Sequence, residues 1–271
     1  MSSPAKVDGI DATTTEVLVR MKRRKFVKIC ASAVVGVSAS PEILARGDRE
    51  YHPYNRVKLI GHKTLEPITT ASLEVGTTYL FHYPFVTTPC FLIDLGKPVM
   101  RGENLKTREG NHYRWNGGVG PKRSIVAFSA ICTHRMSHPA RSVSFINYRH
   151  GKASFKNHQN EIVEQQQVIY CCSEKSVYNP ARGGMVLGGP APQPLAAIAL
   201  DYDQNSDQIY ATATMGGEMF NQYFAAFGQR LVLDHGRTDI RNAAIDTTSL
   251  LTLDEYCANQ IVCDAEGASE A

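Results

Sequence analysis

Short runs of β-branched and apolar residues recur along this 271-residue chain, with turn-forming residues between them. Runs of this kind predict short strands. They occupy residues 57–60, 78–83, 90–95, 124–129, 143–148, 161–170, 185–187, 196–202 and 208–214. Many short strands at even spacing are typical of an antiparallel sandwich or barrel. The predicted fold class is therefore all-β, and a chain with 43% hydrophobic residues can bury a sizeable core.

A different pattern begins after residue 215. Aromatic and aliphatic residues recur at helical spacing, at Phe220, Tyr223, Phe224, Phe227 and Leu231. This pattern predicts a helix of about a dozen residues, either packed against the barrel, which we favour, or bound to a partner. Residues 236–271 have the composition of a loose tail with one short helix around 250–257, and the last eight residues are predicted to be disordered.

Three loops carry the residues with the most specific chemistry. The first contains Cys132-Thr133-His134, and the second runs from Tyr170 to Tyr178 and begins Tyr-Cys-Cys. The third is Gly-Pro-Ala-Pro at 189–192. Taken singly, such a His is also compatible with a turn residue, and such a Cys with a buried small apolar residue. Together the loops indicate metal ligands.

With these loops and the sequence around them, the chain resembles the Rieske iron–sulfur proteins, most closely the small subunit of arsenite oxidase. The shared sequence includes Thr88–Ile93, Gly118–Pro121, Ile125–Ser129 and Ser176–Gly184, within roughly residues 56–215. The resemblance implies a Rieske-type antiparallel β sandwich or barrel with a small cluster-binding subdomain. It also implies a 2Fe–2S cluster, in which one iron takes two Cys and the other two His.

The resemblance assigns ligands residue by residue. Cys132 and His134 match the first ligand pair, and Cys171 matches the first ligand of the second loop. Glu174 falls where the family has its second His. In a rival register that starts one residue later, at the second Cys of the pair, Lys175 takes that place, so neither register supplies a His.

Other positions around the cluster are implied in the same way. Ser176 and Tyr178 match family hydroxyls that donate hydrogen bonds to a sulfide and to a ligand sulfur, and Pro190 belongs to the third loop that covers the cluster. Ser137 and Ser173 stand where many members have two Cys joined by a disulfide, so that bond is expected to be absent.

The missing His leaves two interpretations open. A Glu carboxylate can ligate iron, but as a hard anion it should lower the potential of the cluster. A His from the long insertion between the loops is the alternative ligand, at position 138, 150 or 158. The chain then either binds a cluster with an atypical fourth ligand or has a Rieske fold with an empty site.

The N-terminus predicts export. Lys22–Lys28 contains two Arg, a spacer, Phe, an aliphatic residue and Lys, which matches the twin-arginine pattern. An apolar segment of about eleven residues follows, too short to span a bilayer as a helix, with small residues at Val37–Ala39 suited to a signal peptidase. The alternative is a basic patch before a buried helix. We expect the periplasm, or the outer face of the cytoplasmic membrane if the signal remains as an anchor.

The net charge of +3 arises from this segment. Residues 1–46 hold eight Lys/Arg and four Asp/Glu, so they contribute +4 and the remainder −1. The sequence therefore shows no basic surface of the kind that binds nucleic acid. It also shows no internal repeat and no transmembrane stretch.

These observations predict three regions. They are a signal segment at 1–46, a Rieske domain at 47–215 with cluster loops at about 130–138, 170–179 and 188–193, and a helical extension with a tail at 216–271. The predicted function is single-electron transfer between a periplasmic redox enzyme, or larger catalytic subunit, and an acceptor such as cytochrome c. The alternative is a subunit without a cluster that exports and holds its partner.

Two insertions and three further cysteines complete the predictions. The polar insertion 100–116 contains the single Trp, and the insertion 137–167 separates the ligand loops. Both are candidates for partner contact, and for the first a solvated loop is an equal alternative. Cys90 is predicted to be a core residue. Cys257 and Cys263 are able to form a disulfide in an oxidising compartment, although pairing cannot be derived from sequence.

Overall fold

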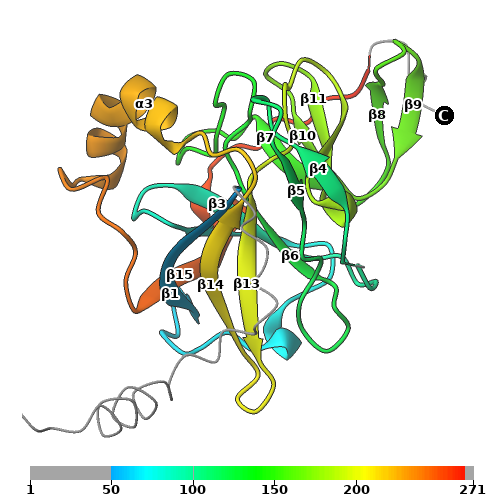
Figure 1. Ribbon diagram of the computed structural model, residues 1–271. Coiled ribbons are helices and arrows are strands. Elements are labelled where there is room, and N and C mark those ends of the chain that lie inside the picture. Colours follow the sequence, from blue (N-terminus) through cyan, green and yellow to red (C-terminus); the bar gives the residue numbers. More distant parts are fainter. Residues whose placement is uncertain (1–49, 100, 266–271) are drawn as a thin grey trace, which may run out of the picture. The chain divides into compact units, whose positions relative to one another are not determined.

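Seven strands close a barrel in the computed structural model, which describes residues 50–99 and 101–265 (Figure 1). Their order around the barrel is β1 (Tyr51–Gly61), β14 (Gln208–Met215), β13 (Ala197–Asp203), β6 (Ile125–Ser129), β3 (Pro89–Asp94), β2 (Thr78–His82) and β15 (Thr247–Thr252). Neighbours are antiparallel except for β1 and β15, which run parallel. The all-β prediction is confirmed.

A second sheet carries two of the three loops and lies at one end of the barrel (Figure 1). Its order is β12 (Met185–Gly188), β11 (Ser176–Asn179), β10 (Val168–Cys171) and β7 (Ile146–Arg149). Two hairpins accompany it: β4 (Asn104–Lys106) with β5 (His112–Arg114), and β8 (Ala153–Lys156) with β9 (Ile162–Gln165). The predicted strand at 161–170 is thus two strands, because Gln167 between them has φ +57° and turns the chain.

Strands β3 and β6 are buried on both faces and connect the barrel to the second sheet. Leu92 packs in a cluster of barrel residues that includes Leu59 and Phe81. Its neighbour Phe91 points the other way, into a cluster that reaches Tyr178 on β11. Because successive side chains of a strand alternate between faces, one strand serves both cores. Cys90 is fully buried in the barrel cluster, as the sequence predicts.

Part of the polar insertion 100–116 is buried, so the insertion as a whole is not a solvated loop or a partner surface. Its hairpin buries Leu105, Tyr113 and Trp115, each 4% exposed or less, in the same cluster as Phe128 of β6. The apolar side chains are spaced by charged ones, so composition alone concealed this face. The hairpin therefore adds to the core on which the second sheet rests.

The C-terminal region is more ordered than the sequence predicts. Helix α3 (Phe220–His235) forms where the aromatic pattern predicts it and packs beside Ile131 of the first loop. The prediction of a loose tail is wrong for 247–252, because β15 completes the barrel between β1 and β2. The predicted short helix is α4 (Leu253–Tyr256), with Thr252 as its N-cap. Short 3₁₀ turns lie at Thr70–Ser72 and Pro180–Arg182.

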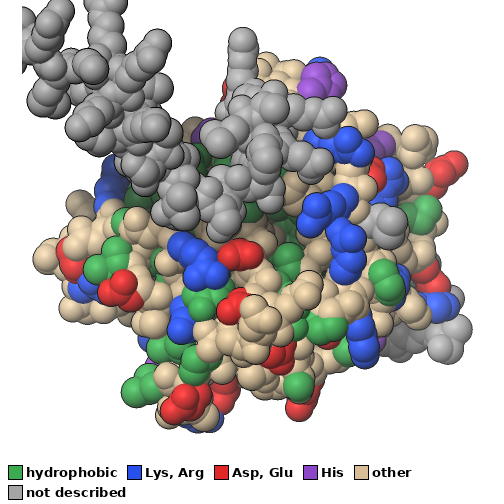
Figure 2. Space-filling model, turned by 60° about the horizontal axis from the view of Figure 1, so that its bottom comes forward, with side chains coloured by type: hydrophobic (Ala, Val, Ile, Leu, Met, Phe, Trp, Pro, Cys, Tyr) green, Lys and Arg blue, Asp and Glu red, His purple; other side chains and the backbone are tan. Residues whose placement is uncertain are grey.

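The signal segment 1–46 and residues 266–271 lie outside the described residues, and so do the predictions made for them. Within the described ranges, no helix is long and apolar enough to cross a membrane. On the face drawn in Figure 2, the described Lys and Arg side chains are interspersed with Asp and Glu, and no single sign of charge covers that face.

Candidate metal centre

The first loop follows β6 and closes into a tight turn around Cys132. The Cys132 backbone N–H donates to Ser137 O at 2.9 Å, and the Met136 N–H donates back to Cys132 O at 2.9 Å. Met136 has φ +59°, which allows the chain to reverse within this short turn. Cys132 itself is fully buried, whereas His134 is partly exposed.

The second loop is the four-residue turn between β10 and β11. Cys171 and Ser176 are paired across the two strands, so the turn consists of residues 172–175. Cys171 and Ser176 are both fully buried, and Glu174 is only partly exposed. Lys175 is exposed and has φ +58°.

A disulfide joins Cys172 to Cys263. Cys263 therefore pairs with the second loop and not with Cys257, whose thiol is free and buried. The bond also argues against the rival register, because a cysteine in a disulfide has no thiolate to offer a metal. Cys171 keeps its free thiol.

The thiols of Cys132 and Cys171 lie close enough to interact with one another. This contact lowers the pKa of Cys132 to about 6, against the opposing effect of burial. The Tyr178 hydroxyl, 3.2 Å from Cys132 Sγ, and the backbone N–H groups of His134 and Arg135 lower it further. The environment of Cys132 thus favours a thiolate, the form that binds metals.

The pKa of the Cys171 thiol is shifted in the opposite direction. Contact with the more acidic Cys132 raises its pKa, and burial raises it further. The Glu174 backbone N–H and the Ser137 hydroxyl both donate toward its sulfur and favour the thiolate. Ser137 therefore links the first loop to the second through a hydrogen bond, at one of the two positions where the resemblance predicts no disulfide.

His134 and Glu174 form a second pair between the same two loops. His134 Nδ1 lies 3.8 Å from Glu174 Oε2, and Glu174 Oε1 lies 3.5 Å from an Arg135 guanidinium nitrogen. The Nδ1 atom is buried and makes no hydrogen bond. Across residues 50–99 and 101–265, no three His, Cys, Asp or Glu side chains converge as a mononuclear site requires. The arrangement is two pairs, Cys with Cys and His with Glu.

Two buried hydroxyls in the site differ in their hydrogen bonding. The Tyr178 hydroxyl lies 3.2 Å from Cys132 Sγ, from Thr133 N and from Thr133 Oγ1. Thr133 in turn donates to the backbone oxygen of Gln193, which ties the first loop to the chain beyond the third. The Ser176 hydroxyl is buried and has no hydrogen-bond partner. A buried hydroxyl without a partner is costly, so its position suits an acceptor that arrives with a bound group.

The third loop packs its backbone directly onto the second. Gly189 has φ +81°, and a Cβ there would lie 2.2 Å from Lys175 O and 2.6 Å from Ser176 Cα. Only glycine permits so close an approach. Pro190, which follows, is exposed at the same end of the sheet.

The three alternative histidines are engaged elsewhere. His138 packs edge-on against Tyr223 and Phe227 of α3, with ring centroids 4.8 Å apart in both pairs. His150 Nδ1 lies 3.3 Å from the Tyr148 hydroxyl, and His158 Nε2 lies 3.4 Å from a backbone oxygen of β12. Glu174 is the residue that stands beside His134.

These residues fit a two-iron cluster better than a single ion. A Rieske cluster takes its ligands in two pairs, one pair for each iron. Here Cys132 and Cys171 form a sulfur pair, and His134 and Glu174 a nitrogen–oxygen pair. Backbone N–H groups and hydroxyls aimed at both sulfurs complete the kind of surroundings that tune iron–sulfur centres.

Two known proteins are similar to parts of this chain. No family model matches the chain. The iodate reductase subunit IdrB of Denitromonas iodatirespirans is 26% identical over 144 residues, which are 53% of this chain and 58% of that protein. The soluble domain of the Rieske protein II (soxF) from Sulfolobus acidocaldarius is 26% identical, with a TM-score of 0.41 over 61% of this chain and 82% of that domain. The chain is thus similar over about half its length to a reductase subunit.

Sequence reasoning missed several residues of this site. The Ser137 bond to the Cys171 sulfur, the Thr133 bond to Gln193 and the Cys172–Cys263 disulfide all join segments distant in sequence. No local pattern signals them, except that Cys172 follows Cys171 directly. The chain matches little more than half the length of IdrB, so the activity of the whole protein is a matter for proposal.

Proposed function

We propose that this protein is an electron-transfer subunit that holds a 2Fe–2S cluster between Cys132, His134, Cys171 and Glu174. The contact between the Cys132 and Cys171 thiols, with donors aimed at both sulfurs, carries the proposal. When bound, a 2Fe–2S cluster supplies a one-electron couple whose potential depends on its net charge and hydrogen bonds. Single electrons pass between a catalytic partner and an acceptor such as cytochrome c.

The residues around the site raise or lower the reduction potential of a bound cluster. The Tyr178 hydroxyl and the backbone N–H groups of His134 and Arg135 stabilise negative charge on the Cys132 sulfur, which favours the reduced state. The Glu174 carboxylate acts in the opposite direction, because it brings a negative charge where the family has a neutral imidazole. Arg135, at 3.5 Å, offsets part of that charge.

The deciding experiment is low-temperature EPR of the dithionite-reduced protein, with iron and acid-labile sulfide assayed on the same sample. We expect iron and sulfide in equal amounts and a signal from a reduced 2Fe–2S cluster. Glu174→His removes a carboxylate charge and supplies the family ligand, so the potential should rise and the spectrum should approach that of ordinary Rieske proteins. Protein from its native host with no iron and no signal would refute the electron-transfer role.

A second candidate function is a subunit without a cluster that holds its partner. The observation in its favour is that Glu174 already has two charged or polar neighbours, His134 and Arg135, in place of a metal. This function predicts that Glu174→Gln destabilises the protein while leaving its metal content at zero. The electron-transfer function predicts that the same variant changes the EPR spectrum or loses iron.

A larger catalytic partner belongs to the proposal. IdrB is named as a subunit of a reductase, which supports an assembly of this kind here. We expect a larger redox enzyme or a cytochrome to co-purify from native membranes or periplasm. Isolation of a stable monomer from the native organism, with no associated protein, would count against the partnership.

Export by the twin-arginine route is proposed from Arg23 and Arg24. A disulfide among the described residues supports an oxidising compartment. The variant Arg23→Lys with Arg24→Lys should accumulate in the cytoplasm, as cell fractionation would measure. Normal periplasmic yield of this variant would show that the pair is not an export signal.

A further inference from the structure

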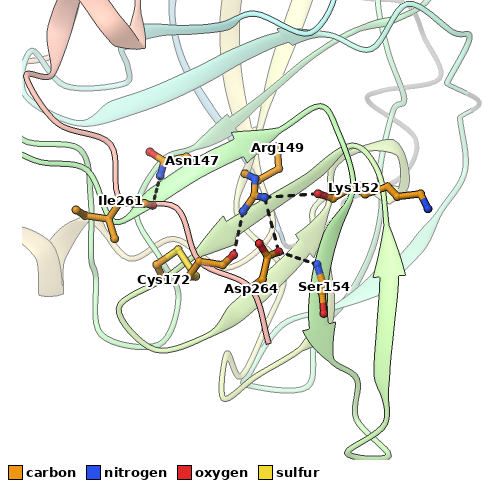
Figure 3. The surroundings of a disulfide bond; sticks show 8 residues. Asn147, Arg149, Lys152, Ser154, Cys172, Ile261 and Asp264 are labelled. Carbon is orange, nitrogen blue, oxygen red and sulfur yellow. Dashed lines mark hydrogen bonds and ion pairs between the residues drawn. A yellow bond between two sulfur atoms is a disulfide. The ribbon is translucent and has the colours of Figure 1, made fainter. Parts of the chain in front are cut away.

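The C-terminal segment, residues 258–265, runs beside the insertion that separates the two ligand loops (Figure 3). The Ser144 N–H donates to Asn259 O at 2.8 Å, and the Ile261 N–H donates to Ser144 O at 2.9 Å. These bonds place the segment along the chain that leads into β7. The last described residues therefore lie at the edge of the second sheet, next to the second loop.

Side chains of β7 fasten the segment further. Asn147, buried in the interior, donates from Nδ2 to Ile261 O at 2.7 Å. The Arg149 guanidinium donates to Cys263 O at 2.9 Å and lies 3.7 Å from Asp264 Oδ1 (Figure 3). These side chains bind the backbone of the segment at residues 261 and 263 and the side chain of residue 264. The path of the segment is therefore defined up to the disulfide.

The disulfide ends this path at the start of the second loop. Cys172 is the first residue of the turn, directly after Cys171 and two residues before Glu174. Its backbone N–H donates to Phe145 O at 2.6 Å, in the same insertion that the C-terminal segment follows. The first residue of the turn is thus bonded both to the insertion and to the C-terminal segment.

Other restraints on the turn are weaker. Toward the first loop, the described residues offer hydrogen bonds, from Ser137 to the Cys171 sulfur and between Tyr178 and Cys132. Ser173, in the middle of the turn, is exposed. Among the described residues, the Cys172–Cys263 bond is the one covalent link between the second loop and a distant part of the chain.

We propose that the Cys172–Cys263 disulfide is a positioning device that holds Cys171 and Glu174 of the second loop against the first loop. When the bond is broken, the turn opens and bound iron leaves the site sooner. The inference deepens the proposed function and rests on it for the part that concerns iron. The part that concerns the position of the loop is independent of whether iron is bound.

The test replaces both cysteines, Cys172→Ser with Cys263→Ser, in the full chain. Both are replaced because a lone thiol at 172 would compete with Cys171 as a ligand. Hydrogen exchange of the backbone amides of residues 172–176 should become about tenfold faster, as expected when a local restraint on opening is removed. The matched control is Leu59→Ala, which lowers stability in the fully buried barrel core without touching the loop.

A second arm uses the unmodified protein and reduces the disulfide with dithiothreitol, a dithiol. The reaction transfers two electrons and two protons to Cys172 and Cys263, giving two thiols, while the dithiol closes into its own disulfide. The same amides should exchange faster, and iron should pass to a chelator several-fold sooner. Reoxidation should restore the original exchange rates. This arm decides the matter even if the double variant does not fold.

The two proposals fail in different ways. Unchanged exchange of residues 172–176 after reduction, or exchange no faster than in Leu59→Ala, would overturn the positioning role even if the cluster is present. Absence of iron from the native protein would overturn the electron-transfer role, and the exchange of the loop amides would still test the disulfide. Faster exchange together with faster iron release supports both.

Discussion

Tyr178→Phe deletes a single buried hydroxyl that contacts the first loop in three places. Its oxygen lies 3.2 Å from Cys132 Sγ, Thr133 N and Thr133 Oγ1. Thr133 Oγ1 gives its own proton to Gln193 O, so it can only accept from Tyr178. The Tyr178 proton thus has two acceptors at equal distance, the Cys132 sulfur and Thr133 Oγ1, and a charged sulfur attracts it more strongly, while the Tyr178 oxygen accepts the Thr133 N–H.

The stability cost follows from this pattern. The substitution keeps the ring, so packing is nearly unchanged, but the buried Thr133 N–H loses its hydrogen-bond acceptor. An unsatisfied buried donor costs about 1–3 kcal/mol. For a chain of this size, each kcal/mol lowers Tm by about 2–4 °C. Thermal unfolding of the variant and the original protein, at equal pH and iron content, measures this loss.

The potential should fall as well, because the hydrogen bond to sulfur is stronger when the cluster carries more negative charge. If the reduced state loses about 1 kcal/mol more than the oxidised state, a one-electron couple shifts by about −40 mV. A redox titration followed by EPR measures the shift. Tyr83→Phe is the matched control, since the buried Tyr83 hydroxyl donates to Asn55 O at 3.1 Å in the barrel. Equal potentials in the two variants would refute the assignment of Tyr178 to the site.

Two further predictions concern glycine and histidine. Gly189→Ala should destabilise the protein by more than about 1 kcal/mol, because φ is +81° and the Cβ would strike the backbone of the second loop. Gly151→Ala, with open space around its Cβ, should leave urea unfolding unchanged, and equal midpoints for the two would contradict the packing. Burial, together with the charges of His235 and Arg141, lowers the pKa of His82 to about 3. The folded protein then keeps His82 neutral while the unfolded chain takes up a proton, so this stability is present above pH ~6.5 and is lost as pH falls toward 3. His82→Phe should lose less stability than the original protein between pH 7 and 4 in urea titrations, and equal losses would contradict this.

Six of the seven barrel strands were predictable because each carries its own signal. Runs such as those at β3 and β14 are apolar or alternate along the strand, and that alternation reports burial wherever the partner strand lies. The helix α3 was predictable for the same reason, from the spacing of its aromatic residues. The candidate ligands Cys132, His134 and Cys171 came from a resemblance that rests on contiguous motifs.

Strand β15 shows where the sequence by itself stopped being sufficient. Its residues, Thr247–Thr252, are half polar, and they become a strand by filling the gap between β1 and β2. The burial that stabilises β15 comes from strands whose positions depend on the rest of the barrel. A local pattern carries no information on such a gap.

The candidate site divides in the same way. The sequence by itself determined which residue types are available as ligands, including a Glu where the family has a His. Tertiary structure alone decided that the Cys132 and Cys171 thiols lie close together, that Glu174 stands beside both His134 and Arg135, and that Cys263 bonds to Cys172. Those contacts join residues tens of positions apart, and their distances depend on how the two sheets pack, which no single segment of the chain encodes.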